Sequence, residues 1–158
     1  MSNIIEVEYD LVERSELNRD EIDDLMEADL ARKESHAPYS NFPVGAAITA
    51  NDGQLYVGWK LENPENDGLH AAENALGQMP AKSRVTGIKR ITMVGGPREG
   101  YYDDAVTPCN PCRQQLLEFV RPEDNPLIIM AGTRGKVLRV YLKNELPQGF
   151  YPACASKR

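Results

Sequence analysis

The sequence predicts a single α/β domain in which helices pack on a mixed β-sheet. Two observations carry this prediction: helical and strand-like hydrophobic patterns alternate along the chain, and no repeat or linker interrupts them. A length of 158 residues suits one domain, and 41% hydrophobic residues suffice for its core. We therefore expect residues 1–158 to form one unit, with an N-terminal arm at 1–18 and a C-terminal tail at 144–158.

The first predicted helix covers residues 19–36. Asn18, followed by Glu21 three residues later, matches a capping box, which satisfies free N–H groups at a helix start. Pro38 ends the helix, because the residue before a proline is disfavoured in the helical conformation. Four apolar residues recur at helical spacing and are expected to form the buried stripe: Ile22, Leu25, Met26 and Leu30.

The remaining elements are five strands and two further helices. The strands are expected at 43–50, 54–62, 87–95, 126–132 and 136–143. Residues 51–53, Asn-Asp-Gly, lie between the first two and are a strong hairpin signal. Residues 4–14 alternate weakly and are expected to form an edge strand or an arm. Helices are expected at 70–79 and 109–120, the second after a long loop at 96–108.

The charge balance and the hydrophobic pattern argue against several classes of function. The chain has 24 acidic and 18 basic residues and a net charge of −6, whereas proteins that wrap duplex nucleic acid usually carry a basic excess. No apolar run approaches the roughly 18 residues that a membrane helix needs. The opening MSNIIEVEYDLVE lacks the basic start of a signal peptide. We therefore expect a cytoplasmic protein with no nucleic-acid or membrane partner; the charge balance does not exclude a small, neutral or cationic ligand.

The three cysteines cannot all pair within one chain, and two of them, Cys109 and Cys112, form a C-x-x-C motif. In a reducing compartment this spacing indicates a metal site or redox chemistry. A thioredoxin-like redox pair comes just after the first strand, whereas this motif follows three predicted strands. The position of the motif favours metal binding. Cys154 lies in the tail and is given no role.

His70 is the candidate third ligand. It begins one predicted helix, as the cysteines begin another, and the free N–H groups and dipole at a helix start stabilise thiolates. One nitrogen and two sulfur ligands leave a fourth tetrahedral position for water, which is the arrangement of a catalytic zinc. The alternative is that His70 only caps its helix. The other histidine, His36, is expected to be a surface residue near the end of the first helix.

These residues resemble a known family. His70-Ala71-x, followed by Pro108-Cys109-x-x-Cys112, is similar to the zinc deaminase signature H-x-E…P-C-x-x-C. Three further segments resemble the small, homotetrameric type of cytidine deaminase: APYSNFPVGAA at 37–47, TPCNPCRQQLLEF at 107–119 and ELPQGF at 145–150. The resemblance implies a three-layer α/β/α fold with a central mixed five-stranded sheet, one Zn²⁺ per chain and a homotetramer.

The resemblance also implies an activity and roles for individual residues. The activity is zinc-dependent hydrolytic deamination of cytidine, deoxycytidine or a closely related cytosine nucleoside, N4-modified ones included, as in pyrimidine salvage. The zinc would be held by His70, Cys109 and Cys112. The substrate would be bound by Phe42 against the pyrimidine ring, Glu62 at a ribose hydroxyl, the amide of Ala71 at the base, and Phe150 from a neighbouring subunit.

The sequence departs from the family pattern at three places. Ala72 stands where the family has the glutamate that moves protons, and Glu73 follows it. A Glu→Ala knockout made by engineering is the favoured account, because the rest of the site is complete; a natural pseudoenzyme and a role of Glu73 as the base remain open. Lys60 replaces the asparagine before Glu62, which indicates either an altered sugar pocket or a solvated lysine. The loop 62–68 also differs, so the identity of the sugar and of any N4 substituent stays open.

Three other functions compete with nucleoside deamination. An aminonucleoside-antibiotic deaminase of the blasticidin S type would use the same chemistry on another sugar. A zinc-stabilised protein that binds nucleosides without turnover would explain Ala72 directly. Deamination of a base within RNA or DNA is disfavoured by the acidic charge balance.

Overall fold

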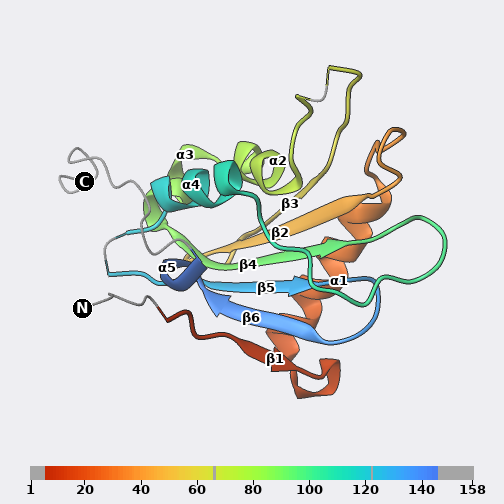
Figure 1. Ribbon diagram of the computed structural model, residues 1–158. Coiled ribbons are helices and arrows are strands. Elements are labelled where there is room, and N and C mark those ends of the chain that lie inside the picture. Colours follow the sequence, from red (N-terminus) through yellow and green to blue (C-terminus); the bar gives the residue numbers. More distant parts are fainter. Residues whose placement is uncertain (1–5, 66, 122, 146–158) are drawn as a thin grey trace, which may run out of the picture.

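A mixed β-sheet runs through the centre of the computed structural model, which describes residues 6–65, 67–121 and 123–145 (Figure 1). The strands are β1 (Asp10–Val12), β2 (Val44–Ala50), β3 (Leu55–Trp59), β4 (Ile88–Gly95), β5 (Leu127–Ala131) and β6 (Val137–Tyr141). Their order in the sheet is β1-β6-β5-β4-β2-β3. Strands β4 and β5 pair in parallel and the other neighbours pair antiparallel.

Helices cover both faces of the sheet, so the predicted three-layer α/β/α architecture is confirmed (Figure 1). The helices are α1 (Arg19–Lys33), α2 (Ala71–Gln78), α3 (Ala81–Thr86), α4 (Asn110–Glu118) and α5 (Leu142–Glu145), and a 3₁₀ turn spans Arg14–Glu16. Helix α1 lies on one face, and α2 and α4 lie on the other (Figure 1). Among the described residues, no helix has the length and apolar character needed to span a membrane.

The sheet has six strands rather than the five implied by the resemblance, because the segment at 4–14, expected to be an edge strand or an arm, supplies the edge strand β1. This strand pairs antiparallel with β6, and Leu11 lies opposite Leu138. This strand has three residues and pairs with a single neighbouring strand, so its sequence shows little of the alternation that marks a half-buried strand. The short helices α3 and α5 are missing from the prediction, because six and four residues are too few to show a helical period.

The predicted start of helix α1 is confirmed and its predicted end is wrong. Asn18 and Glu21 form the expected capping box, in which each side chain accepts the backbone N–H of the other at 3.0 Å. The helix ends at Lys33, three residues early. Beyond it the Ser35 hydroxyl donates to the carbonyl of Val44 at 2.8 Å, and the chain turns toward the edge of the sheet.

The predicted buried stripe of α1 is largely wrong. Leu25 is buried as expected, but three of the four stripe residues are exposed: Ile22, Met26 and Leu30. The helix instead turns Glu21 and Asp24 toward the sheet, where Arg90 Nε donates to Asp24 at 2.7 Å and Arg139 lies 3.4 Å from Glu21. Each buried carboxylate has an arginine partner, which offsets its cost of desolvation.

Two glycines allow helices to lie directly on the sheet. A Cβ on Gly45 of β2 would lie 2.1 Å from the carbonyl oxygen of Ala28 in α1. A Cβ on Gly58 of β3 would lie 2.2 Å from the backbone nitrogen of Ala75 in α2. Only glycine leaves room for such close backbone approach. The position of α2 over the sheet therefore depends on Gly58.

Gly58→Ala should destabilise the protein, because the new Cβ collides with the backbone of α2. Overpacking of this kind costs about 1–3 kcal/mol or more, and in a chain of this size each kcal/mol lowers the Tm by about 2–4 °C. Gly77→Ala is the matched control, because a Cβ at Gly77 in α2 meets nothing within 4 Å and alanine favours the helix by up to about 1 kcal/mol. Thermal unfolding followed by circular dichroism measures both, and equal Tm values for the two variants would contradict this packing.

Candidate functional site

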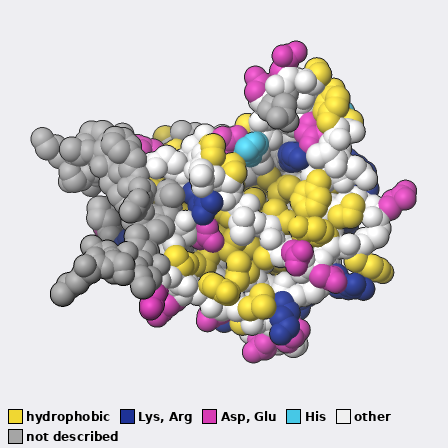
Figure 2. Space-filling view, in the orientation of Figure 1, with side chains coloured by type: hydrophobic (Ala, Val, Ile, Leu, Met, Phe, Trp, Pro, Cys, Tyr) yellow, Lys and Arg dark blue, Asp and Glu magenta, His cyan; other side chains and the backbone are white. Residues whose placement is uncertain are grey.

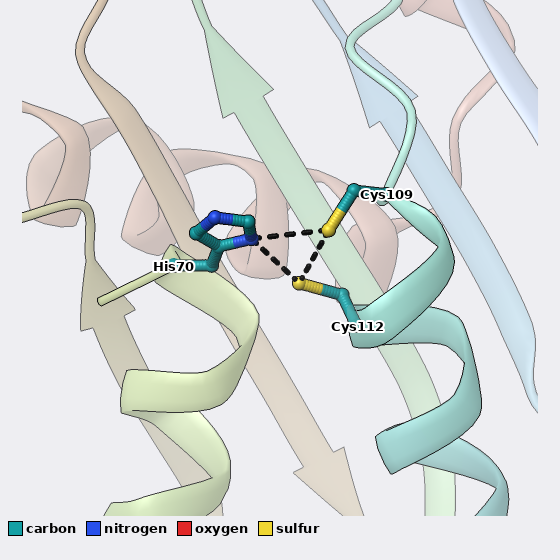
Figure 3. Close-up of side chains that lie close together, drawn as sticks. All are labelled: His70, Cys109 and Cys112. Atoms are coloured by element: carbon teal, nitrogen blue, oxygen red, sulfur yellow. Dashed lines mark hydrogen bonds between the residues drawn. The ribbon is translucent and has the colours of Figure 1, made fainter. Parts of the chain in front are cut away.

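Three side chains suited to metal binding converge where helices α2 and α4 begin (Figure 3). His70 is the N-cap residue of α2, Cys109 is the N-cap residue of α4, and Cys112 lies in the first turn of α4. The His70 Nδ1 atom lies 3.0 Å from the Cys109 Sγ atom and 3.3 Å from the Cys112 Sγ atom, and the two sulfurs are 3.2 Å apart. The imidazole points across from α2 to both sulfurs (Figure 3).

The donor set and its geometry fit a tetrahedral Zn²⁺. Zinc takes imidazole nitrogen at about 2.0–2.1 Å and thiolate sulfur at about 2.3 Å, so ligand atoms around it lie roughly 3.5–3.8 Å apart. The observed triangle of 3.0, 3.2 and 3.3 Å needs to widen by only about half an ångström. Within the described part of the chain no fourth His, Cys, Asp or Glu joins the cluster. Three protein ligands leave one position for water or substrate.

The surroundings of the Cys112 thiol disfavour its charged form when no cation lies beside it. Burial raises the pKa of the Cys112 thiol well above its ordinary value, and the neighbouring Cys109 and Glu73 raise it further. A thiolate at Cys112 therefore needs a positive charge beside it. Metal binding supplies that charge, since thiols coordinate in the deprotonated form.

The two residues predicted for proton transfer lie in very different surroundings. Ala72 is fully buried in the same hydrophobic cluster as Cys112. The Glu73 carboxylate binds two partners: Oε2 accepts the backbone N–H of His70 at 3.1 Å, and Oε1 accepts the side-chain amide of Gln115 at 2.8 Å. Glu73 thus completes the capping box of α2 and links α2 to α4. Gln115 is a residue that the sequence analysis missed, since its partner is distant in sequence.

Phe42, predicted to contact a pyrimidine ring, is half-buried in the loop before β2. Its ring packs edge-on against Tyr102, with centroids 5.0 Å apart and an interplanar angle of 86°. Tyr102 comes from the long loop between β4 and α4, where no periodic pattern signals a packing role. The preceding Asn41 adopts a left-handed conformation with φ of 51°. In the view of Figure 2, hydrophobic side chains gather in the middle of the face, with charged side chains around and between them.

Glu62, predicted to bind a ribose hydroxyl, already accepts hydrogen bonds from four donors. The backbone N–H groups of Tyr39 and Ser40 donate to Oε2 at 2.9 and 3.2 Å. The Ser40 hydroxyl donates to Oε1, and the Lys60 ammonium lies 2.6 Å from the same oxygen. The hydrogen bond from Lys60, followed by that from Ser40, lowers the pKa of Glu62 to about 2. Glu62 is therefore charged at every ordinary pH. The sequence analysis singled out Lys60 but not Ser40.

The strand-end segment that carries Lys60 and Glu62 lies beside the start of α2. Leu61, between them, pairs with Leu69, which directly precedes His70. The side chain of His36 is not part of the metal cluster, and the residue is exposed, as predicted. Phe150 and Cys154 lie outside the described residues.

Comparison with known proteins supports the assignment of the His70–Cys109–Cys112 cluster as a zinc site. Residues 20–124 match the family model for the cytidine and deoxycytidylate deaminase zinc-binding region. The cytidine deaminase of Sporosarcina psychrophila is 29% identical over 126 residues, which cover 80% of this chain and 88% of that protein. The crystal structure of cytidine deaminase from Burkholderia pseudomallei matches with a TM-score of 0.68 at 26% identity, over 85% of this chain and 100% of that one.

A second solved structure, cytidine deaminase from Mycobacterium leprae, matches at 31% identity with a TM-score of 0.64, over 84% of this chain and 100% of that one. The family model covers more than half of the sequence and includes all three residues of the metal cluster. The cluster fits one Zn²⁺ per chain. On these grounds the chain belongs to the cytidine and deoxycytidylate deaminase family.

Proposed function

We propose that this chain binds a cytosine nucleoside at the His70–Cys109–Cys112 cluster, and that it lacks the group needed to deaminate it. The observation that carries the proposal is a complete His-Cys-Cys triangle with a buried alanine, Ala72, two residues after the histidine. Family membership supports hydrolytic deamination of a cytosine nucleoside as the reaction for which this site is built. The relatives named above are cytidine deaminases, which supports the substrate class.

The chain's own residues supply binding and orientation. His70, Cys109 and Cys112 would hold a zinc ion, which would make hydroxide available from water near neutral pH for attack on an amino-bearing ring carbon. The Phe42 ring, which packs edge-on against Tyr102, offers an apolar face for the pyrimidine. The N–H of Ala71 is the first of helix α2, and N–H groups at a helix start have no intrahelical acceptor. It therefore suits a polar atom of the base.

The missing function is proton transfer. Ring N3 must gain a proton as C4 becomes tetrahedral, and the amino group must gain one to leave as ammonia. Ala72 cannot carry a proton, and the Glu73 carboxylate accepts hydrogen bonds from His70 and Gln115, which hold it between α2 and α4. Loss of a positioned acid–base group costs about 10²–10⁴-fold for each role. We therefore infer that the present chain binds its ligand and turns it over negligibly.

The second candidate is a protein whose own role is to bind nucleosides, rather than a deaminase that has lost its glutamate. It is favoured by the packing of Ala72, which is fully buried in the same hydrophobic cluster as Cys112. The homotetramer, with Phe150 completing a neighbouring site, and a role in pyrimidine salvage remain predictions from the resemblance. The cytoplasmic location remains a prediction from the sequence, and an antibiotic deaminase remains the alternative that the departures at Lys60 and the loop 62–68 suggest.

The purified protein should contain about one zinc ion per chain, as a site with three protein ligands and one open position implies. Elemental analysis measures the content, and removal of the metal by a chelator should lower the Tm, because metal binding is coupled to folding. His70→Ala should reduce zinc occupancy. His36→Ala is the control and should leave the occupancy unchanged, since His36 is exposed and outside the cluster. Freshly purified protein without zinc, and with a Tm that chelation leaves unaltered, would refute the metal site.

Ala72→Glu should produce a deaminase. We expect at least about a 100-fold rise in turnover of cytidine or deoxycytidine, because the variant restores a proton-transfer group. Loss of cytosine absorbance and release of ammonia measure it. Ala72→Gln is the size-matched control, which cannot move protons in the same way and should stay as inactive as the parent chain. Zinc content and thermal unfolding establish that both variants are folded.

Two outcomes would change the assignment. If the parent chain is fully active and Glu73→Gln abolishes turnover, Glu73 is the base. If folded, zinc-loaded Ala72→Glu binds cytosine nucleosides and stays inert, the chain is a binding protein.

A further inference from the structure

Three side chains next to Phe42 form a closed hydrogen-bond network, which we call the Ser40–Lys60–Glu62 network. It joins the loop before β2 to the segment after β3. The Ser40 hydroxyl accepts the N–H of Phe42 at 3.1 Å, and the Lys60 ammonium lies 3.4 Å from the Phe42 carbonyl oxygen. The network thus holds both backbone polar groups of the residue that is proposed to contact the pyrimidine ring.

The hydrogen-bonding capacity of Glu62 is fully used within the protein. A carboxylate offers about four acceptor sites. Four donors fill them here: the N–H groups of Tyr39 and Ser40, the Ser40 hydroxyl and the Lys60 ammonium. A sugar hydroxyl can donate to Glu62 only by displacing one of these hydrogen bonds.

The hydrogen-bonding groups of Lys60 and Ser40 are also fully used within the protein. The three N–H bonds of the ammonium have three acceptors: Glu62 at 2.6 Å, the Ser40 hydroxyl at 3.0 Å and the Phe42 carbonyl at 3.4 Å. The Ser40 hydroxyl donates to Glu62 and accepts from Lys60 and from the Phe42 N–H. No polar group of these three side chains is left for a ligand without breaking a hydrogen bond.

The network nevertheless borders the proposed site. Leu61 lies between Lys60 and Glu62 and pairs with Leu69, the residue before His70. The side chains of Lys60 and Glu62 keep 24% and 12% of their surface exposed, so both are accessible from solvent. Because its hydrogen bonds are already made within the protein, this network can contact a ligand but cannot distinguish ligands by their hydroxyl groups.

We propose that Lys60 is a specificity-determining residue that removes recognition of sugar hydroxyls from this site, so that the protein binds cytosine nucleosides with and without these hydroxyls almost equally well. Displacing the ammonium from Glu62 exchanges one charge-assisted hydrogen bond for another and gains little. A site that does bind a hydroxyl rejects the analogue lacking it strongly, since its own polar group is then left unpaired. The inference rests on the proposed binding of a cytosine nucleoside.

The first test compares four ligands on the zinc-loaded full chain: cytidine, 2′-deoxycytidine, 3′-deoxycytidine and 2′,3′-dideoxycytidine. Isothermal titration calorimetry gives each Kd without any need for turnover. We expect the four values to agree within about threefold, which is far below the tenfold or greater rejection that follows the loss of a hydrogen bond to a charged group. Rejection of the deoxy analogues by more than this would overturn the inference.

The second test removes the ammonium. Lys60→Asn frees one acceptor site on Glu62, and we expect the preference for cytidine over 3′-deoxycytidine to rise about tenfold. Lys60→Met keeps the length of the side chain without its charge and should raise the preference for cytidine by the same factor. It provides a second measurement if Lys60→Asn fails to fold. Lys136→Asn is the matched control: Lys136 also pairs with a glutamate, Glu13 at 3.1 Å, but on the exposed turn before β6. It should leave the preference unchanged.

The outcomes separate this inference from the proposed function. If the parent and both Lys60 variants all bind the four ligands within threefold, Lys60 is not the determinant and the inference fails. The inference fails equally if Lys136→Asn shifts the preference as Lys60→Asn does. If no cytosine nucleoside binds the zinc-loaded parent, the proposed function fails first and this inference with it.

Discussion

The meeting of two helix starts, those of α2 and α4, is the constraint on which the site depends. His70 and the cysteines reach one another only because both helices lie on the same face of the sheet with their N-terminal ends together. Three features hold this arrangement: the close approach of α2 to β3 at Gly58, the shared hydrophobic cluster beneath both helices, and the Glu73–Gln115 hydrogen bond between them. The fold thus brings the three ligand side chains to one place.

Much of the metal site could be predicted from sequence, because its signals are local. The C-x-x-C spacing, the position of His70 and the helix starts all lie within short segments whose conformation the residues themselves determine. The capping box at Asn18 and the Asn-Asp-Gly hairpin are predictable for the same reason. These features can be predicted without knowing which residues lie opposite them in the folded sheet.

The errors come from partners that are distant in sequence. Helix α1 buries Asp24 rather than Met26, because Asp24 pairs with Arg90, which lies 66 residues further along the chain. A hydrophobicity pattern carries no information about such a partner. The network of Lys60 with Glu62 and Ser40, and the contact of Phe42 with Tyr102, also join segments that come together only when the sheet forms.

The separation of the metal ligands along the chain also bears on how the protein folds. His70 and Cys109 are 39 residues apart, and β4, in the middle of the sheet, lies between them. Closing so long a segment costs chain entropy, which pairing of the central strands offsets before the ligands meet. Contacts that form after the folding transition state change the unfolding rate rather than the folding rate. A zinc ion at the junction of α2 and α4 would be a contact of this kind, so it would slow unfolding and change the folding rate little.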